Sequence, residues 1–118
     1  MNNKEIVLTD LAGRLINPTQ EIEWNGETYW PLGIICGRVI LVKPFMSKTE
    51  DYTPLVEEIK LILRPIDSLT KDELESCGEF AISTDGSIVA EKEVFDWFDR
   101  NGVDYRGLIK MGLAKEKK

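Results

Sequence analysis

The sequence predicts a single α+β domain, in which an antiparallel sheet of four or more strands is followed by a helical C-terminal half. The 118 residues fit one domain. Hydrophobic residues make up 42% of the chain and charged residues 31%, which is typical of a globular protein. Strand patterns are grouped between residues 21 and 63 and helical patterns follow residue 70, an order that indicates α+β rather than alternating βαβ architecture.

The chain is expected to begin with a short helix over residues 9–16. Thr9 or Asp10 provides the N-terminal cap, because a side-chain oxygen there accepts a hydrogen bond from a free backbone N–H. Apolar residues share one face of this helix. Pro18 ends it, since the residue before a proline is pushed out of the α region.

A β-hairpin is expected to follow the helix. Residues 21–24 alternate acidic and apolar side chains, which is typical of a half-buried strand. Asn25-Gly26 then separates them from the β-prone residues 28–30. This dipeptide predicts a type I′ turn, in which both central residues have positive φ.

Two further features define the second and third strands. Pro31 cannot donate a ladder hydrogen bond, so it predicts an edge or a bulge before the second strand resumes at residues 32–36. Gly37 marks another turn, and a third strand covers residues 38–42. Polar residues 47–54 are expected to form an exposed loop.

A fourth strand is expected over residues 57–63, ended by the Pro at position 65. A helix follows it. Thr70 and Glu73 have the spacing of a capping box, in which side chain and backbone satisfy each other's free groups. Gly78 is suited to the left-handed conformation that ends a helix.

The remaining elements are a hairpin and two helices. Asp85-Gly86 lies between two short apolar arms and predicts the hairpin turn. A longer helix covers residues 91–100. Asp104 is expected to cap a last short helix reaching residue 111, and residues 112–118 to form a solvated tail.

The composition argues against several kinds of active site. The chain contains no His, which removes the commonest general base and the commonest metal ligand. The two cysteines, Cys36 and Cys77, are far apart in sequence and are interpreted as reduced thiols rather than as a disulfide or a reactive site. There is no phosphate-binding loop. We therefore predict no catalytic residue, no cofactor and no metal.

The net charge and the length of the apolar runs argue against nucleic-acid and membrane partners and favour a cytoplasmic location. The net charge is −6, which disfavours a protein that grips nucleic-acid phosphates. The longest apolar stretch, residues 32–42, is interrupted by Gly and Arg and is shorter than a membrane span. No signal peptide is recognised at the N-terminus. We expect a cytoplasmic protein without a membrane partner.

Three segments resemble a known family. Residues 61–70, LILRPIDSLT, are similar to an "LRPLSDLT" segment, residues 103–114, VDYRGLIKMGLA, to an "FDVFGLIEKGLA" ending, and residues 8–12 to an "LxDLA" opening. These motifs occur in short uncharacterised proteins encoded by phages and prophages of Bacteroidetes. The chain departs from that pattern after its opening and over residues 91–100. The resemblance implies an origin in a phage or another mobile element and brings no activity with it.

Aromatic side chains give the first candidate contact surface. Trp24, Tyr29 and Trp30 lie around the first predicted hairpin, and exposed Trp and Tyr side chains are favoured as interface anchors. Core packing is the alternative interpretation. Strand alternation places Tyr29 and Trp30 on opposite faces, so one of them is expected to face away from the core.

A second candidate contact pair is Tyr105 with Arg106, in the segment that carries the family-like ending. The alternative is that this segment locks the C-terminus onto the core. Arg64 is interpreted as a structural partner of Asp67 or Glu73 rather than as an exposed anion contact.

The sequence leaves three functional classes open. We favour a non-enzymatic accessory protein that acts through protein–protein interaction, with a partner or with itself. The first alternative is a nucleic-acid-associated module, in which C-terminal helices present Arg100, Arg106 and Lys110, or an acidic mimic of DNA. The second is a carboxylate-dependent hydrolase, for which the acidic group on the long helix is the candidate: Glu93, Asp96 and Asp99.

Overall fold

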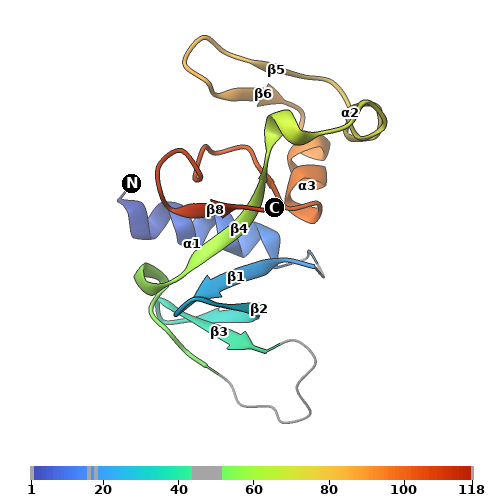
Figure 1. Cartoon of the computed structure of the whole chain (residues 1–118). Coiled ribbons are helices and arrows are strands. Elements are labelled where there is room, and N and C mark those ends of the chain that lie inside the picture. Colours follow the sequence, from blue (N-terminus) through green and yellow to red (C-terminus); the bar gives the residue numbers. More distant parts are fainter. Residues whose placement is uncertain (1, 16, 18, 44–51, 118) are drawn as a thin grey trace.

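The computed structural model describes residues 2–15, 17, 19–43 and 52–117, and it confirms the α+β class (Figure 1). Strands β1 to β4 lie in the N-terminal part, and helices α2 and α3 lie in the C-terminal half. The elements are α1 (Asn3–Arg14), β1 (Glu21–Trp24), β2 (Glu27–Ile35), β3 (Arg38–Val42), η1 (Val56–Glu58), β4 (Lys60–Pro65), η2 (Ile66–Ser68), α2 (Lys71–Cys77), β5 (Phe80–Ile82), β6 (Ile88–Ala90), α3 (Lys92–Arg100), β7 (Val103–Asp104) and β8 (Ala114–Glu116).

Helix α1 begins six residues before the expected start and has a different cap. The Asn2 side chain accepts a hydrogen bond from the Glu5 backbone N–H at 2.9 Å. Asp10, one of the two expected caps, lies within the helix and is fully buried. The helix ends at Arg14, before the predicted stop at Pro18, which lies outside the described residues.

The predicted turns of the first three strands are confirmed. Asn25 and Gly26 have φ values of 53° and 78°, as a type I′ turn requires. Cys36 and Gly37 form the second turn, with φ values of 50° and 75°. The pairing of β2 with β3 shifts register between Pro31 and Gly33, so the expected irregularity is a bulge. Of the expected loop, residues 47–51 lie outside the described residues.

The sheet is mixed rather than purely antiparallel. Strands β3, β2, β1 and β4 form the predicted antiparallel part, in that order. Strands β7 and β8 both pair with β4 in parallel, which the sequence did not predict. Glu57 and Glu58, expected in the fourth strand, form the 3₁₀ turn η1 instead.

The end of the chain differs from the expectation in two ways. No helix forms over residues 104–111, and residues 114–116 are strand β8 rather than part of a solvated tail. Asp104 does accept the backbone N–H groups of Leu108 and Ile109, at 2.9 and 3.0 Å. Gly107 and Gly112 both adopt a φ of 77°, which an α-helix cannot continue through, so the capped segment remains a set of turns.

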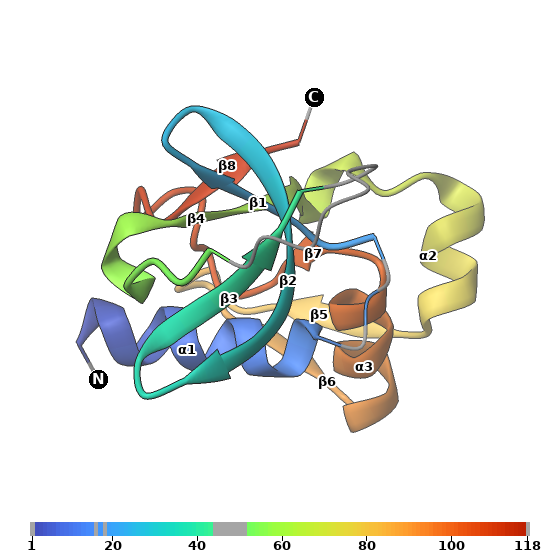
Figure 2. The same ribbon diagram turned by 90° about the horizontal axis from the view of Figure 1, so that it is seen from below.

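Two apolar clusters hold the fold. The first lies between α1 and the sheet and includes Leu11, Ile22 and Leu61, all fully buried. The second lies among α2, α3 and the β5–β6 hairpin, around Phe98. Figure 1 shows the second group of elements at the opposite end of the molecule from β2 and β3, and Figure 2 shows α2 and α3 near each other at one side of the molecule.

Most local predictions for this second group are confirmed. Thr70 and Glu73 form the reciprocal capping box of α2, with hydrogen bonds of 3.1 and 3.2 Å. Gly78 follows the helix with a positive φ of 100°, but its ψ of −177° differs from the left-handed helical conformation that was expected. Strands β5 and β6 pair as an antiparallel hairpin around Asp85-Gly86, and α3 begins one residue after the expected position.

Candidate functional site

The aromatic residues of the first hairpin are divided between the two faces of the sheet. Tyr29 is only 3% exposed and packs against Trp24 and Tyr52, with ring centroids 5.5 and 5.2 Å apart. Trp30 is paired with Val42 on the opposite face and is half-buried. The predicted alternation is confirmed. Tyr29 is a core residue, so its side chain is not placed to contact a partner.

Tyr105 and Arg106 contact α1 and α3 within the molecule. Arg106 donates from Nε to Asp10 Oδ1 at 2.9 Å and from Nη2 to the Tyr105 hydroxyl at 3.2 Å. Its guanidinium lies 5.0 Å from the centre of the Tyr105 ring. The Tyr105 hydroxyl in turn donates to Asp99 Oδ1 at 2.9 Å.

Arg14 lies at the centre of the same network and is fully buried. It donates to both carboxylate oxygens of Asp10, at 2.6 and 3.2 Å. It also donates to the backbone carbonyls of Phe98 and Val103, at 3.4 and 2.7 Å. We call these five side chains the ionic lock: Asp10, Arg14, Asp99, Tyr105 and Arg106.

The electrostatics of the ionic lock follow from its burial. Burial raises the pKa of Tyr105 to about 12, and the nearby Asp99 carboxylate adds to the effect. Burial also raises the pKa of Asp99, against the opposing hydrogen bond from Tyr105. The network joins α1 to α3 and to residues 103–106, which agrees with the alternative that this segment locks the C-terminal part onto the core.

Arg64 has the structural role expected of it. Its guanidinium donates to both carboxylate oxygens of Glu73, at 2.6 and 2.8 Å, and so ties the end of β4 to the start of α2. The Arg64 hydrogen bond, with the backbone N–H of Thr70, lowers the pKa of Glu73 from 4.5 to about 2. The partner is Glu73 and not Asp67.

The carboxylates proposed for a hydrolase do not converge. Asp96 pairs with Lys92 at 3.0 Å, Asp99 accepts from Tyr105, and Glu93 is exposed. Among the described residues, no three Cys, Asp or Glu side chains are grouped in a way that could hold a metal ion.

The second C-terminal helix that the nucleic-acid alternative requires is not formed, because turns replace it over residues 104–111. Of the three proposed cationic residues, Arg106 is already paired with Asp10. Arg100 and Lys110 are exposed.

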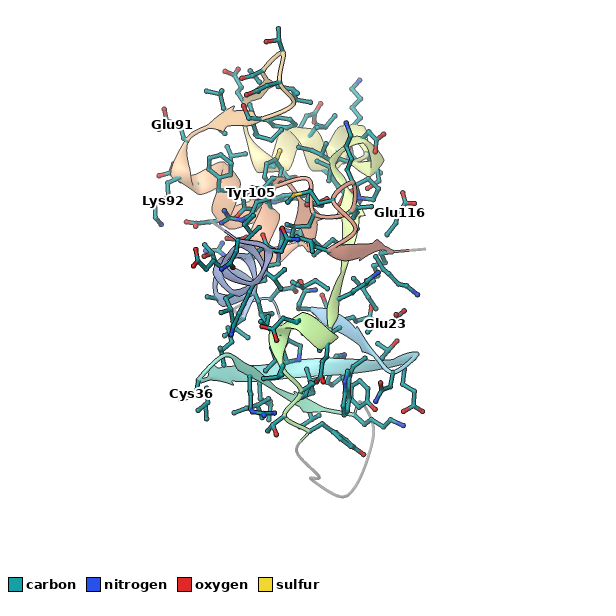
Figure 3. All side chains as sticks on the ribbon, turned by 90° about the vertical axis from the view of Figure 1, so that its left-hand side faces the viewer. Glu23, Cys36, Glu91, Lys92, Tyr105 and Glu116 are labelled. Carbon is teal, nitrogen blue, oxygen red and sulfur yellow. The ribbon has the colours of Figure 1, made fainter. Side chains whose placement is uncertain are left out.

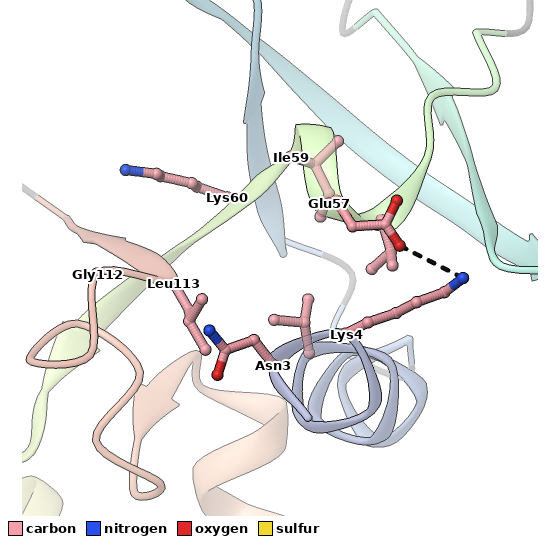
Figure 4. A pocket seen from close by; sticks show the side chains of 9 residues that line it. Asn3, Lys4, Glu57, Ile59, Lys60, Gly112 and Leu113 are labelled. Carbon is pink, nitrogen blue, oxygen red and sulfur yellow. Dashed lines mark ion pairs between the residues drawn. The ribbon is translucent and has the colours of Figure 1, made fainter. Parts of the chain in front are cut away.

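A cavity of about 300 Å³ lies between the N-terminal end of α1, η1 and the segment before β8 (Figure 4). Its floor is apolar and includes Val7, Ile59 and Leu113. On its rim Lys4 is paired with Glu57 at 3.4 Å, as the dashed line in Figure 4 marks. This volume is at the lower limit for ligand pockets, and one of its two lysines already has an internal partner.

The charge of the protein is concentrated in one part of the fold. Residues 71–100, which we call the acidic lobe, contain nine of the 21 Asp and Glu residues and three of the 15 Lys and Arg residues. The lobe therefore carries a net charge of −6, equal to that of the whole chain, and the rest of the chain is neutral. Six of its acidic side chains are exposed: Asp72, Glu75, Glu79, Asp85, Glu91 and Glu93.

Large apolar side chains are exposed on the same lobe. Val89 is 61% exposed, Ile82 58% and Leu74 42%. Val89 lies beside Ala81 in an open depression that Glu79 and Glu91 flank. Figure 3 shows Glu91 and Lys92 on this part of the molecule, far from Cys36 at the turn of β2 and β3.

The acidic lobe is not among the candidates predicted from the sequence, although its signal is present there. The net charge of the whole chain does not reveal the lobe, whereas the net charge of residues 71–100 alone locates it. A second exposed apolar pair, Leu32 and Ile35 on β2, also lies outside the predicted set.

Comparison with family models, with curated proteins and with solved structures found no match to this chain. Within the described residues, no helix has both the length and the apolar character needed to cross a membrane.

Proposed function

We propose that this chain is a non-enzymatic binding protein whose acidic lobe docks on a basic, partly apolar surface of a protein partner. The observation that carries the proposal is the coincidence of the entire net charge with exposed apolar side chains on one lobe. Charge of one sign steers a partner of opposite charge, and apolar contact area supplies affinity once water is excluded.

The same charge disfavours two other occupants of this surface. Nucleic-acid phosphates would be repelled by a net charge of −6. A second copy of the chain would place two such lobes in contact, which is also repulsive. A protein with Lys or Arg around apolar residues satisfies both features of the lobe.

A DNA-binding protein is the special case in which the lobe would act as a mimic of DNA. The concentration of exposed carboxylates supports this second candidate, because the basic face of such a partner normally meets phosphates. Competition by duplex DNA for the same partner would distinguish it from other basic proteins.

The origin and the location that we propose rest on other residues. The family-like segments at residues 61–70 and 103–114 support an origin in a phage or another mobile element. Two free thiols, of which Cys36 is exposed, support a reducing compartment such as the cytoplasm.

The test compares two variants that change the net charge equally. The lobe variant combines Glu79→Gln, Asp85→Asn and Glu91→Gln. The control combines three exposed acidic residues on η1 and at the start of α1: Glu5→Gln, Glu57→Gln and Glu58→Gln.

Proteins retained by the immobilised chain are identified by mass spectrometry, and the purified partner is titrated calorimetrically against each variant. We expect the lobe variant to bind at least about tenfold more weakly at 50 mM salt and the control within about twofold, with the difference shrinking at 200 mM salt. Equal weakening by the two variants, or a retained partner with an acidic contact surface, would refute the proposal.

A further inference from the structure

A groove of about 400 Å³ separates the β5–β6 hairpin from the turns before β8. Its hairpin side is lined by Gly86 and Ile88 and its opposite side by Gly107 and Ile109, with Ile66 between them. Among the described residues that line it, those from the hairpin belong to β6 and the preceding turn and none to β5. The groove therefore lies beside the start of β6, at Ile88.

The outer edge of β6 has backbone groups available for pairing. The Ser83 N–H donates to the Ser87 carbonyl at 2.8 Å, so these two residues occupy a hydrogen-bonded position of the ladder, although the Ser87 N–H donates to Asp85 Oδ1 instead. In an antiparallel ladder such pairs alternate with non-bonded pairs. Ile88 and Ala90 consequently direct their N–H and C=O groups away from β5.

Within the described residues, β5 and β6 form a sheet of two strands only. An isolated two-stranded hairpin is marginally stable, and a third strand adds main-chain hydrogen bonds and covers apolar surface. The groove beside β6 offers the space where such a strand would lie.

We infer that the partner binds as an added β-strand along β6, in the groove between the hairpin and residues 107–110. This inference rests on the function proposed above and assigns one strand of the acidic lobe, β6, as the docking edge, with the rest of the groove supplied by residues outside the lobe. The occupant is an extended segment with alternating apolar and basic side chains. The apolar side chains meet Ile66, Ile88 and Ile109, and the basic ones face the acidic rim.

The charges around the groove support a basic segment. Asp67 and Glu116 line it and are exposed, and Lys110 is the cationic residue on its rim. Asp104 also lines it, although its two oxygens already accept backbone N–H groups. The rim is therefore negative overall, as is the lobe to which β6 belongs.

The probe for this mode of binding is a synthetic peptide of alternating Arg and Val, blocked at both ends. It is titrated into the ¹⁵N-labelled full chain while amide shifts and amide hydrogen exchange are recorded. We expect shifts at residues 86–90 and 107–110. We also expect slower exchange at Ile88 and Ala90, whose N–H groups would gain a partner.

Ala90→Pro removes the outward N–H and leaves the β5–β6 ladder bonds in place, and Ala90→Ser is the matched control. Since a net hydrogen bond contributes about 0.5–1.5 kcal/mol, we expect Ala90→Pro to weaken peptide binding by about two- to tenfold and Ala90→Ser to leave it unchanged. Should the proline variant fail to fold, the exchange of Ile88 and Ala90 in the unmodified chain decides the question.

The outcomes separate this inference from the proposed function. Binding with shifts around Ala81 and Val89, and no protection at Ala90, would overturn strand addition while leaving the acidic lobe as the docking surface. No binding of the peptide would overturn the inference as stated, whereas the partner titration tests the proposed function independently.

Discussion

Replacing Arg14 with Met tests whether the ionic lock stabilises the fold. Arg14 and Asp10 are both fully buried, and Met replaces the apolar stem of the arginine without the charged guanidinium. The substitution removes two hydrogen bonds to Asp10 and one each to the carbonyls of Phe98 and Val103. Asp10 is left as a buried carboxylate with Arg106 as its remaining cationic partner.

The expected decrease in the free energy of unfolding follows from these contacts. Removing one member of a buried ion pair costs about 3–5 kcal/mol, because the other charge is left uncompensated. Arg106 still donates to Asp10, and the Phe98 carbonyl keeps a second donor in the backbone N–H of Asn101. We therefore expect Arg14→Met to destabilise the protein by about 3 kcal/mol, the lower end of that range.

Urea unfolding followed by Trp fluorescence measures this change, with Arg106→Met as the comparison. The Arg106 side chain is 36% exposed, so its loss is expected to cost only about 1 kcal/mol. The double variant Asp10→Leu, Arg14→Met removes both charges and should be more stable than Arg14→Met alone. A cost for Arg14→Met below about 1 kcal/mol, or a double variant less stable than the single one, would refute the reasoning.

Two further predictions concern the junctions of the helices. The pKa of Glu73 is lowered from 4.5 to about 2 in the folded state, so the stability it contributes is present above pH 4.5 and is lost as the pH falls towards 2. Glu73→Gln should therefore reduce the loss of stability between pH 6 and pH 3 in urea unfolding, and an unchanged pH dependence would contradict the assignment. At Gly13, an added Cβ would lie 3.0 Å from Asp99 Oδ2, within the ionic lock. Gly13→Ala should destabilise α1 by about 1–2 kcal/mol despite the better helix propensity of Ala, and a higher melting temperature would show that Asp99 can move.

The parts of the fold that could be predicted from sequence depend on near neighbours in the chain. Asn25-Gly26 specifies its turn because Asn and Gly adopt positive φ values more readily than other residues do. The capping box works in the same way, since Thr70 and Glu73 are three residues apart. These signals need no knowledge of the rest of the fold.

The parts that were missed depend on residues far apart in the chain. The sequence pattern predicts Asp10 as a helix cap, but its partner Arg106 is 96 residues away. The i,i+4 spacing of Asp10 and Arg14 was a local signal for their pair, although not for its burial. Strand β8 pairs with β4 in parallel, and neither segment alone specifies that pairing.

The distribution of ion pairs sets the acidic lobe apart from the rest of the protein. Outside the lobe, several acidic side chains are paired across elements, as in Glu21 with Lys117 and Glu23 with Lys115. Within the lobe, Glu73 pairs with Arg64 and Asp96 with Lys92. For the part of the chain that the structure describes, no ion pair joins the other exposed carboxylates of the lobe.

Unpaired charges of one sign repel one another and destabilise the compact state. The unpaired carboxylates of the lobe therefore destabilise the isolated chain. The exposed apolar side chains of the lobe add no stability there either, because they are not buried. A partner of opposite charge would relieve both at once, by neutralising the carboxylates and covering Val89, which lies with Glu79 and Glu91 around one depression. Local departures from the rules of stability are expected where a protein binds something, and the acidic lobe departs from two of them.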